Sequence, residues 1–209
     1  DIISAPDVES IYKVPLGFEE QDLTSRILDK LKLKRKDKDL KEWKEFVGKI
    51  NKAKKEVKIG VVGKYFTTGD FTLADSYVSV IEAIKHAAWT QGLNPKISWI
   101  DSGKVLGNEK ILSKFGGIIV PGGFGSRDIE GKIATIKYCR ENKIPYFGLC
   151  YGMQLACVEY ARNVLGLVNA HTTEVDPQTK YPIIHIMPDQ EKKMLNREYG
   201  GTMRLGAWD

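Results

Sequence analysis

Cys150 stands at the centre of the pattern in this sequence that most resembles a reactive site. It is flanked by Gly148 and Gly152 at the point where an apolar stretch, IPYFGL, gives way to a helical pattern, YGMQLACVEYARNVLG. A strand-to-helix turn tight enough to expose one side chain brings the backbone close on both sides, which glycine two residues before and after permits. The N-terminus of the following helix favours a thiolate. We therefore predict that Cys150 is a nucleophile, and we interpret Cys139 and Cys157, within helical patterns, as buried structural cysteines.

A thiolate that attacks a carbonyl group needs hydrogen-bond donors for the oxyanion that develops. The turn offers one donor in the backbone N–H of Tyr151. The glycine-rich segment PGGFG, residues 121–125, follows the apolar stretch GGIIV and offers a second donor at Gly123. A phosphate-binding loop is the alternative for this segment, but it fits neither GxxxxGK[ST] nor a complete dinucleotide-binding pattern. We predict an oxyanion loop.

The elements that must position these groups alternate between strand and helix from residue 57 onward. Apolar strand patterns at VKIGVVG, KISWID, GGIIVPGG and IPYFGL are separated by helical patterns, among them DIEGKIATIKYCRENK. Such alternation predicts an α/β fold, a doubly wound, mostly parallel sheet with helices on both faces, preceded by a short helical linker. In such a sheet, functional groups gather at the carboxyl ends of the strands.

The first 56 residues have a different character. Residues 1–33 contain one amphipathic helical pattern, which is predicted to pack either on other parts of a larger protein or on the region that follows. Residues 30–58 hold 13 Lys/Arg and 5 Asp/Glu, a local charge of +8 against a total of +5, so the rest of the chain is slightly acidic. This mixed-sign run is more typical of a solvated connector, over residues 34–56, than of a nucleic-acid surface.

Composition excludes several classes of protein. With 42% hydrophobic and 28% charged residues in 209, the chain is expected to fold around a core. Three cysteines without paired spacing suggest neither a disulfide framework nor a zinc site, and no apolar run is long enough for a membrane span. We expect a cytoplasmic protein with no metal ligands and no nucleic-acid or membrane partner.

These features together resemble class I glutamine amidotransferase domains, and in particular the CTP synthase family. The resemblance rests on the run from PGGFGSRDIEG through FGLCYGMQLACVEYARNV, on NAHTTEVDPQTKYPII, and more specifically on DVESIYKVP near the start and GGTMRLG near the end. It implies three parts: the closing segment of a synthetase domain (1–33), an interdomain linker (34–56), and a glutamine amidotransferase domain (57–209) incomplete at its C-terminus.

The resemblance also implies roles for individual residues. Cys150 matches the nucleophile that attacks the side-chain amide of L-glutamine, releases ammonia and forms a γ-glutamyl thioester. Gly123 and Tyr151 match the oxyanion donors. The glutamine-binding positions are Gly123, Tyr151, Gly152, Met153, Gln154 and Glu174, where Glu174 would face the substrate's α-ammonium group.

The family's general base is expected to be missing from this chain. Its His and Glu, and a substrate-binding Arg, would lie beyond residue 209. His171, which we place in a loop, His86 and His185 match no catalytic position of the family. Tyr151 replaces a frequent Leu, and Asp128 a Gly, without removing the backbone donors. The chain alone is therefore expected to be inactive or incomplete.

The larger enzyme that the resemblance implies would use Mg-ATP to aminate UTP to CTP and would form a homotetramer. No cofactor is expected in this chain. Two alternatives remain open: a non-catalytic, amidotransferase-like regulatory or assembly module, and another thiol hydrolase of the same fold. The second alternative leaves GGTMRLG and DVESIYKVP unexplained.

Overall fold

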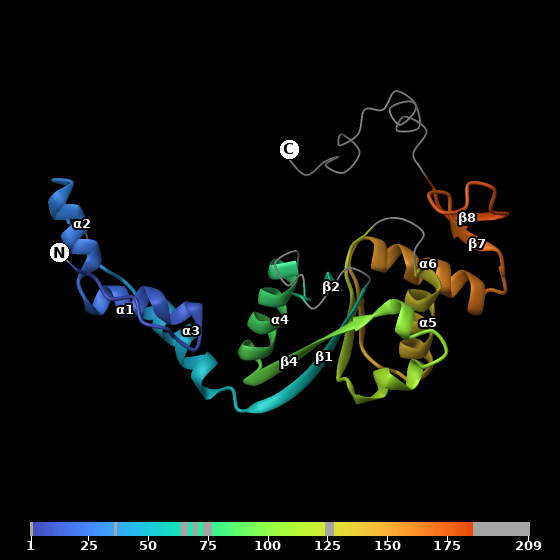
Figure 1. The fold of residues 1–209 in the computed structure, drawn as a ribbon, viewed down its shortest axis with the longest axis horizontal. Helices are drawn as coiled ribbons and strands as arrows, with labels where there is room; N and C mark the ends of the chain where they lie inside the picture. Colours follow the sequence, from blue (N-terminus) through green and yellow to red (C-terminus); the bar gives the residue numbers. More distant parts are fainter. Residues whose placement is uncertain are drawn as a thin grey trace, which may run out of the picture. The chain divides into compact units, whose positions relative to one another are not determined.

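The chain divides into two compact units in a computed structural model (Figure 1). The first unit contains Asp1–Glu56 and Ala83–Pro95, and the second contains Val57–Glu82 and Lys96–Asp209. The structure describes residues 2–35, 37–63, 67–68, 71–72, 77–123 and 128–185. Each unit is described by itself.

The first unit is built mainly from short helices. Pro15 stands in the first turn of α1, where its fixed φ is suited to helix initiation, and Asp22, with a φ of 56°, separates α1 from α2. The helices are η1 (Ile11–Lys13), α1 (Val14–Glu20), α2 (Leu23–Lys30), α3 (Lys41–Lys52) and the greater part of α4 (Val78–Thr90).

An aromatic cluster holds α3 and α4 of the first unit around Tyr12. The indole Nε1 of Trp43 donates a hydrogen bond to the Tyr12 carbonyl at 2.9 Å, and the Phe46 ring meets the Tyr12 ring edge-on with centroids 5.1 Å apart. His86 Nε2 lies 2.5 Å from the Tyr12 hydroxyl, and Trp89 adds a further edge contact. The aromatic side chains of α3, Trp43 and Phe46, are thus used inside this unit.

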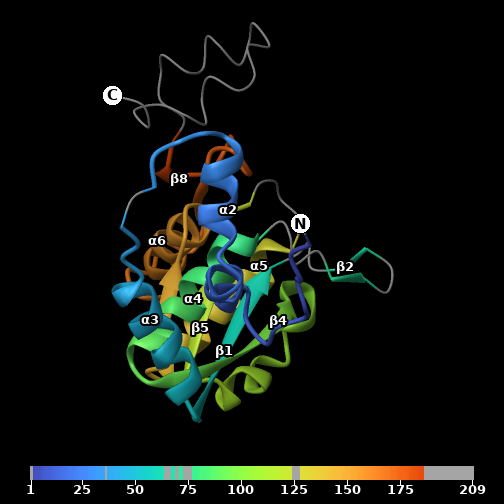
Figure 2. The same ribbon diagram turned by 90° about the vertical axis from the view of Figure 1, so that its left-hand side faces the viewer.

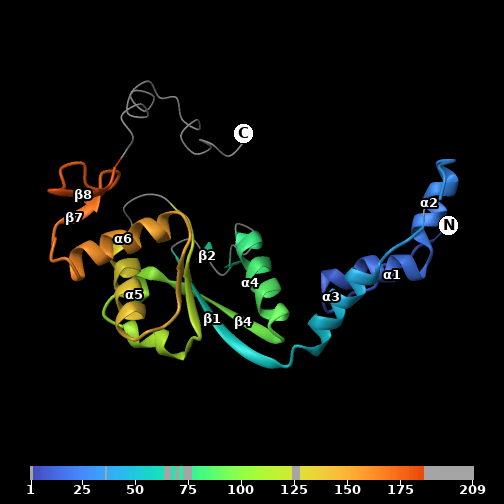
Figure 3. The same ribbon diagram turned by 180° about the vertical axis from the view of Figure 1, so that it is seen from behind.

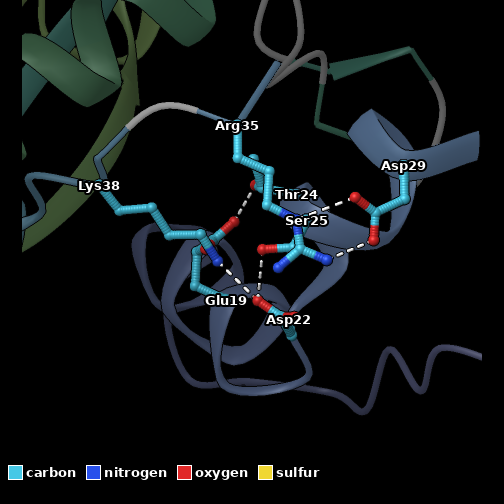
Figure 4. Close-up of polar contacts among 7 residues, drawn as sticks. All are labelled: Glu19, Asp22, Thr24, Ser25, Asp29, Arg35 and Lys38. Carbon is cyan, nitrogen blue, oxygen red and sulfur yellow. Dashed lines mark hydrogen bonds and ion pairs between the residues drawn. The ribbon is translucent and has the colours of Figure 1, made fainter. Parts of the chain in front are cut away.

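A network of ion pairs explains part of the excess of basic residues in the connector (Figure 4). Lys38 Nζ lies 2.7 Å from Glu19 and 2.8 Å from Asp22, while Arg35 pairs with Asp29. Hydrogen bonding to Lys38 lowers the pKa of Glu19 and of Asp22, and bonding to Arg35 lowers the pKa of Asp29. Lys38 and Arg35 are therefore paired with acidic residues of α1, of α2 and of the turn between these helices.

The second unit is organised by a four-stranded sheet in the order β4-β1-β5-β6 (Figure 2). The strands are β1 (Lys55–Gly63), β4 (Leu93–Asp101), β5 (Gly117–Val120) and β6 (Tyr146–Gly148). The central pair β1–β5 and the edge pair β5–β6 are both parallel, with Ile59 opposite Gly117 and Ile118 opposite Tyr146. Parallel neighbours require crossovers, and helices supply them here.

Helices α5 (Ile129–Glu141) and α6 (Tyr151–Asn163) pack against each other and against β6 (Figure 3). One apolar core lies around strand β5; its buried members are Val62, Ile100, Val105, Leu112, Phe115, Ile118, Val120 and Cys139. A second core fills the space between the two helices; its buried members are Ile129, Ile133, Ile136, Tyr151, Leu155 and Val158. Position 151 is therefore both the start of α6 and part of a core.

Smaller elements complete the second unit. Two 3-10 helices, η3 (Ser102–Lys104) and η4 (Glu109–Lys114), lie between β4 and β5. The short strands β2 (Thr67–Thr68) and β3 (Phe71–Thr72) form an antiparallel pair. After α6, β7 (Ala170–Thr172) pairs in parallel with β8 (Tyr181–Ile184) in a separate two-stranded sheet.

The α/β class and the parallel sheet expected from the sequence are confirmed. Two local expectations were wrong. His171 lies in strand β7 and not in a loop, because its backbone pairs with Pro182 eleven residues later, a partner that periodicity cannot reveal. Cys157 is exposed, since it lies on the face of α6 away from the core residues Leu155 and Val158. Cys139 is buried as expected.

Candidate active site

Cys150 occupies a strained turn between β6 and α6. Its backbone has φ +52° and ψ −106°, a combination that residues with a side chain seldom adopt. It is the residue directly before the first turn of α6, and it is exposed. A strained, exposed cysteine at a helix N-terminus is the geometry that the sequence predicts for a nucleophile.

The two flanking glycines are required by close backbone contacts. A Cβ atom at Gly148 would lie 2.5 Å from the carbonyl carbon of Gly152, and one at Gly152 would lie 2.1 Å from the carbonyl oxygen of Val120. Both distances are far shorter than an atomic contact allows. The Leu149 N–H donates to the same Val120 oxygen at 2.9 Å, and the hydroxyl of Tyr146 donates to the Gly152 carbonyl at 2.8 Å. The turn is therefore fixed against the end of β5.

The segment that follows β5 lies beside Cys150. A Cβ atom at Gly122 would be 3.5 Å from the Cys150 Cβ atom and 4.0 Å from its Sγ atom. The structure thus brings together the cysteine and the start of the glycine-rich segment, two features that are 28 residues apart in the sequence. Gly123 is the last described residue of that segment, and Phe124 and Gly125 lie outside the described residues.

Tyr151 joins the cysteine to the core between α5 and α6. Only 2% of its surface is exposed, and burial, with a smaller contribution from the charge of Glu174, raises the pKa of its phenol to about 12. The Nζ atom of Lys132 lies 5.2 Å from the centroid of its ring. Sequence analysis did not find Lys132, because a lysine in a helical pattern normally indicates a solvent-exposed face.

The remaining predicted glutamine-binding residues lie on α6 and after β7. Gly152 is buried, Gln154 is partly buried, and the Gln154 N–H donates to the Cys150 carbonyl at 3.1 Å as part of the first helical turn. Met153 is 51% exposed and lines an apolar groove along α6 with Cys157 and Tyr160. Glu174 is exposed, and its charge acts on the phenol of Tyr151. Glu174 therefore lies near enough to the Tyr151 phenol for its charge to act on it, whereas Met153 faces a separate groove.

The three cysteines have different surroundings. Cys139 is fully buried, and burial raises the pKa of its thiol to about 12, which makes it inert at neutral pH. Cys150 and Cys157 are both exposed. Because exposure alone does not distinguish these two thiols, the turn geometry is what singles out Cys150.

His171 belongs to another group of polar residues. Its Nδ1 atom accepts a hydrogen bond from the Thr172 N–H at 2.8 Å. Burial, helped by the charge of Arg162, lowers the pKa of its imidazole, although Glu130 and Asp176 oppose that shift. With Asp128 and Glu130 it lines a pocket of about 320 Å³. The polar neighbours of His171 are therefore Thr172, Arg162, Glu130 and Asp176.

No metal site was found in the part of the chain that the structure describes: it contains no group of three or more His, Cys, Asp or Glu side chains suited to a metal ion. Within the same ranges, none of the helices has the length and apolar character needed to cross a membrane.

Comparison with known proteins identifies the class of this domain. The family model "Glutamine amidotransferase class-I" matches residues 72–207. The chain therefore belongs to the class-I glutamine amidotransferase family. The strained cysteine turn and the parallel sheet are consistent with that family.

Within that family the chain is similar to CTP synthases, as the sequence motifs had indicated. It is 51% identical over 209 residues to the CTP synthase of Sulfolobus acidocaldarius, and 45% identical to that of Bacillus velezensis. Each match includes 99% of this chain but only 38% of the relative. Among solved structures, the glutaminase domain of Trypanosoma brucei CTPS with bound acivicin has a TM-score of 0.59 and 35% identity, and the match covers 66% of this chain and 53% of that one.

Proposed function

We propose that this chain is the glutaminase part of a CTP synthase, in which Cys150 hydrolyses L-glutamine to supply ammonia. The observation that carries the proposal is the backbone of Cys150, held at φ +52° between glycines that tolerate no side chain, in a chain of the class-I glutamine amidotransferase family. Strain of this kind persists where the surrounding structure enforces it, which is common at active sites.

The proposed reaction begins at the sulfur of Cys150. The thiolate attacks the γ-carbonyl carbon of glutamine, and the C=O electrons move to oxygen, where the backbone N–H groups of Gly123 and Tyr151 donate to the oxyanion. The C–N bond then breaks, ammonia leaves with an added proton, and a γ-glutamyl thioester remains for water to hydrolyse. We assign the general acid and base to no residue of the described ranges; the family resemblance assigns them to a His and a Glu.

Substrate binding is assigned to the residues around the turn. Glu174 would accept charge-assisted hydrogen bonds from the α-ammonium group of glutamine, which are stronger than neutral ones. Gln154, one turn after the nucleophile, and the backbone at Gly152 and Met153 would complete the site. The influence of Glu174 on the Tyr151 phenol supports this assignment, because Tyr151 directly follows the nucleophile.

The remaining functions belong to the longer relatives. This chain spans about 38% of their length, so we propose that ATP-dependent amination of UTP and assembly into a homotetramer involve a synthetase domain. Residues 1–33 would be the closing segment of that domain, and the connector 34–56 would join it to residues 57–209. The described residues offer no carboxylate cluster for magnesium, and no step of that reaction is assigned to them.

A covalent labelling experiment tests the proposal. The folded chain is treated with 6-diazo-5-oxo-L-norleucine, a glutamine analogue that alkylates thiols, and its intact mass is measured. Cys150→Ser is the test variant, and Cys157→Ser is the matched control because Cys157 is also exposed. We expect one adduct that excess glutamine prevents, that Cys150→Ser abolishes and that Cys157→Ser retains.

An adduct on Cys157, or labelling that glutamine does not reduce, would contradict the proposed site. Absence of any adduct in this chain, followed by absence in a protein of the relatives' full length, would favour a non-catalytic module.

A further inference from the structure

Lys132 is a buried basic residue to which the proposed function assigns no role. It lies in the first turn of α5, and only 2% of its surface is exposed. Removing an ammonium group from water is costly unless nearby groups compensate for the lost hydration. The neighbouring core between α5 and α6 is rich in isoleucine, so an apolar side chain would suit this position at lower cost. The presence of the Lys132 ammonium group at this position therefore suggests a role other than filling the core.

The contacts of Lys132 involve both residues proposed as oxyanion donors. Its Nζ atom lies 5.2 Å from the centroid of the Tyr151 ring, within range of a cation–π interaction. The same atom lies 3.9 Å from the place that a Cβ atom of Gly123 would occupy. Lys132 therefore reaches two segments that follow different strands, β5 and β6.

The backbone that carries Lys132 is itself tightly fixed. At the preceding residue, Gly131, a Cβ atom would lie 1.9 Å from the carbonyl oxygen of Ser102, which is closer than any side chain allows. The start of α5 is thus pressed against η3, and a side chain that extends from this point has a well-defined origin.

We propose that Lys132 is a positioning residue that holds the backbone donors at Gly123 and Tyr151 in one geometry through its contacts with both segments. The inference rests on the proposed function, because it needs an oxyanion at this place. Donors that are fixed before the reaction need no reorganisation when charge develops, and small displacements of such groups cost large factors in rate. The positive charge of Lys132 also favours negative charge on the substrate oxygen.

Two reagents for Cys150 separate this role from general support of the fold. With 6-diazo-5-oxo-L-norleucine, sulfur bonds to the diazo-bearing carbon, that carbon takes a proton, and dinitrogen leaves, while the ketone oxygen faces the donors. With iodoacetamide, sulfur displaces iodide from a methylene carbon, and no oxygen needs to be bound at the donor site. Only the first reaction should depend on Lys132.

The variants are Lys132→Met, which keeps length without charge, Lys132→Arg, which keeps charge, and Lys137→Met, an exposed control on the same helix. We expect Lys132→Met to lower the limiting rate of labelling by the glutamine analogue about 10- to 100-fold, with little change in its half-saturating concentration. The iodoacetamide rate should stay within about twofold, because that reaction binds no oxygen at the donor site. Lys132→Arg should recover much of the rate, and Lys137→Met should behave as wild type.

Equal losses with both reagents, a lowered melting temperature with no rescue by Lys132→Arg, or no change in either rate would overturn the proposal. Hydrogen exchange at residues 120–123 and 150–153 provides a test that needs no substrate, and Lys132→Met should accelerate it. If wild-type Cys150 reacts with iodoacetamide but not with the glutamine analogue, both in this chain and in a protein of the relatives' full length, the proposed function fails. Faster exchange in Lys132→Met would then still support the tether, and unchanged exchange would refute it.

Discussion

The residue that defines this molecule, Cys150, depends on neighbours that have no side chain. Its turn exists because Gly152 lets the first turn of α6 approach the end of β5, with the Val120 oxygen only 2.1 Å from the place of an added Cβ atom. At the residue scale, therefore, the close approach of Gly152 to Val120 both shapes the turn that exposes Cys150 and contributes to the stability of the fold.

We expect Gly152→Ala to lower the free energy of unfolding by about 3 kcal/mol or more, because the clash is with backbone and neither strand nor helix can shift freely. The measurement is chemical denaturation followed by circular dichroism. Gly48→Ala is a matched control with the opposite sign: it lies within α3, its added Cβ atom meets nothing within 4 Å, and it should stabilise by about 0.5–1 kcal/mol. Equal effects of the two substitutions would refute this account of the turn.

At the scale of elements, α5 and α6 are joined by the ion pair of Arg140 with the buried Glu159 as well as by their apolar core. Arg140 donates from Nε to both carboxylate oxygens of Glu159, at 3.2 and 3.1 Å, and from Nη2 to Oε1 at 2.8 Å. Glu159 is 1% exposed, whereas the Arg140 side chain is 34% exposed. The buried carboxylate of Glu159 therefore needs Arg140 to compensate for its lost hydration, whereas the guanidinium group of Arg140 also contacts water.

Arg140→Leu should destabilise the protein by about 2–4 kcal/mol, because it leaves the carboxylate of Glu159 buried without this partner. Adding Glu159→Leu should recover much of that loss, since the double variant buries no carboxylate at this place. Denaturant midpoints of the two single variants and the double variant complete the cycle. Additive losses would show that the pair is not coupled.

The ion-pair network around Lys38 predicts a pH dependence for the helices α1 and α2. Hydrogen bonding to Lys38 lowers the pKa of Glu19 and of Asp22 from their ordinary values of 4.5 and 3.8. A lowered pKa in the folded state means that the stabilisation is fully present above these ordinary values and is lost as the pH falls through the lowered ones.

Amide protection in α2 should therefore decrease as the pH is brought from 6 to about 3. Added salt should weaken the effect, because Asp22 and Lys38 are exposed. Hydrogen exchange, corrected for the intrinsic pH dependence of exchange, measures it. Lys38→Met should remove most of the pH dependence, while Arg26→Met, at an exposed position of α2, should leave it in place. A wild-type profile independent of pH would contradict the assignment.

At the scale of the whole molecule, the chain matches only part of longer relatives. If the parent protein is a CTP synthase, ammonia must pass from Cys150 to a separate amination site. Free ammonia in neutral water would become ammonium and lose its nucleophilic electron pair, so the two steps are expected to be linked within one assembly.

In a protein of the relatives' full length, Cys150→Ala should abolish glutamine-dependent CTP formation and preserve formation from added ammonia. Both rates are followed by absorbance or chromatography of CTP. Cys157→Ala, on the opposite face of α6 from the core, should leave both rates unchanged. Loss of both activities in a folded Cys150→Ala protein would contradict separate sites.

The sequence by itself determined the class of fold and the centre of the site. Alternating apolar strands and helical patterns are local signals, and each of them reappears as an element: β1, β5, β6, α5 and α6 lie where the patterns predicted. Cys150 and its glycines could be recognised for the same reason, because a tight turn depends on a few adjacent residues and on their freedom of φ.

Only the tertiary structure decided what lies beside that turn. Strand β7 forms through a partner eleven residues away, Cys157 is exposed because of how α6 rotates onto its core, and Lys132 reaches Tyr151 because α5 packs on α6. Contacts of this kind join residues distant in the chain, so no local periodicity encodes them. The sequence alone does not distinguish a lysine on a solvent-exposed face from one that is 2% exposed, as Lys132 is. The packing of the helices decides which of the two it is.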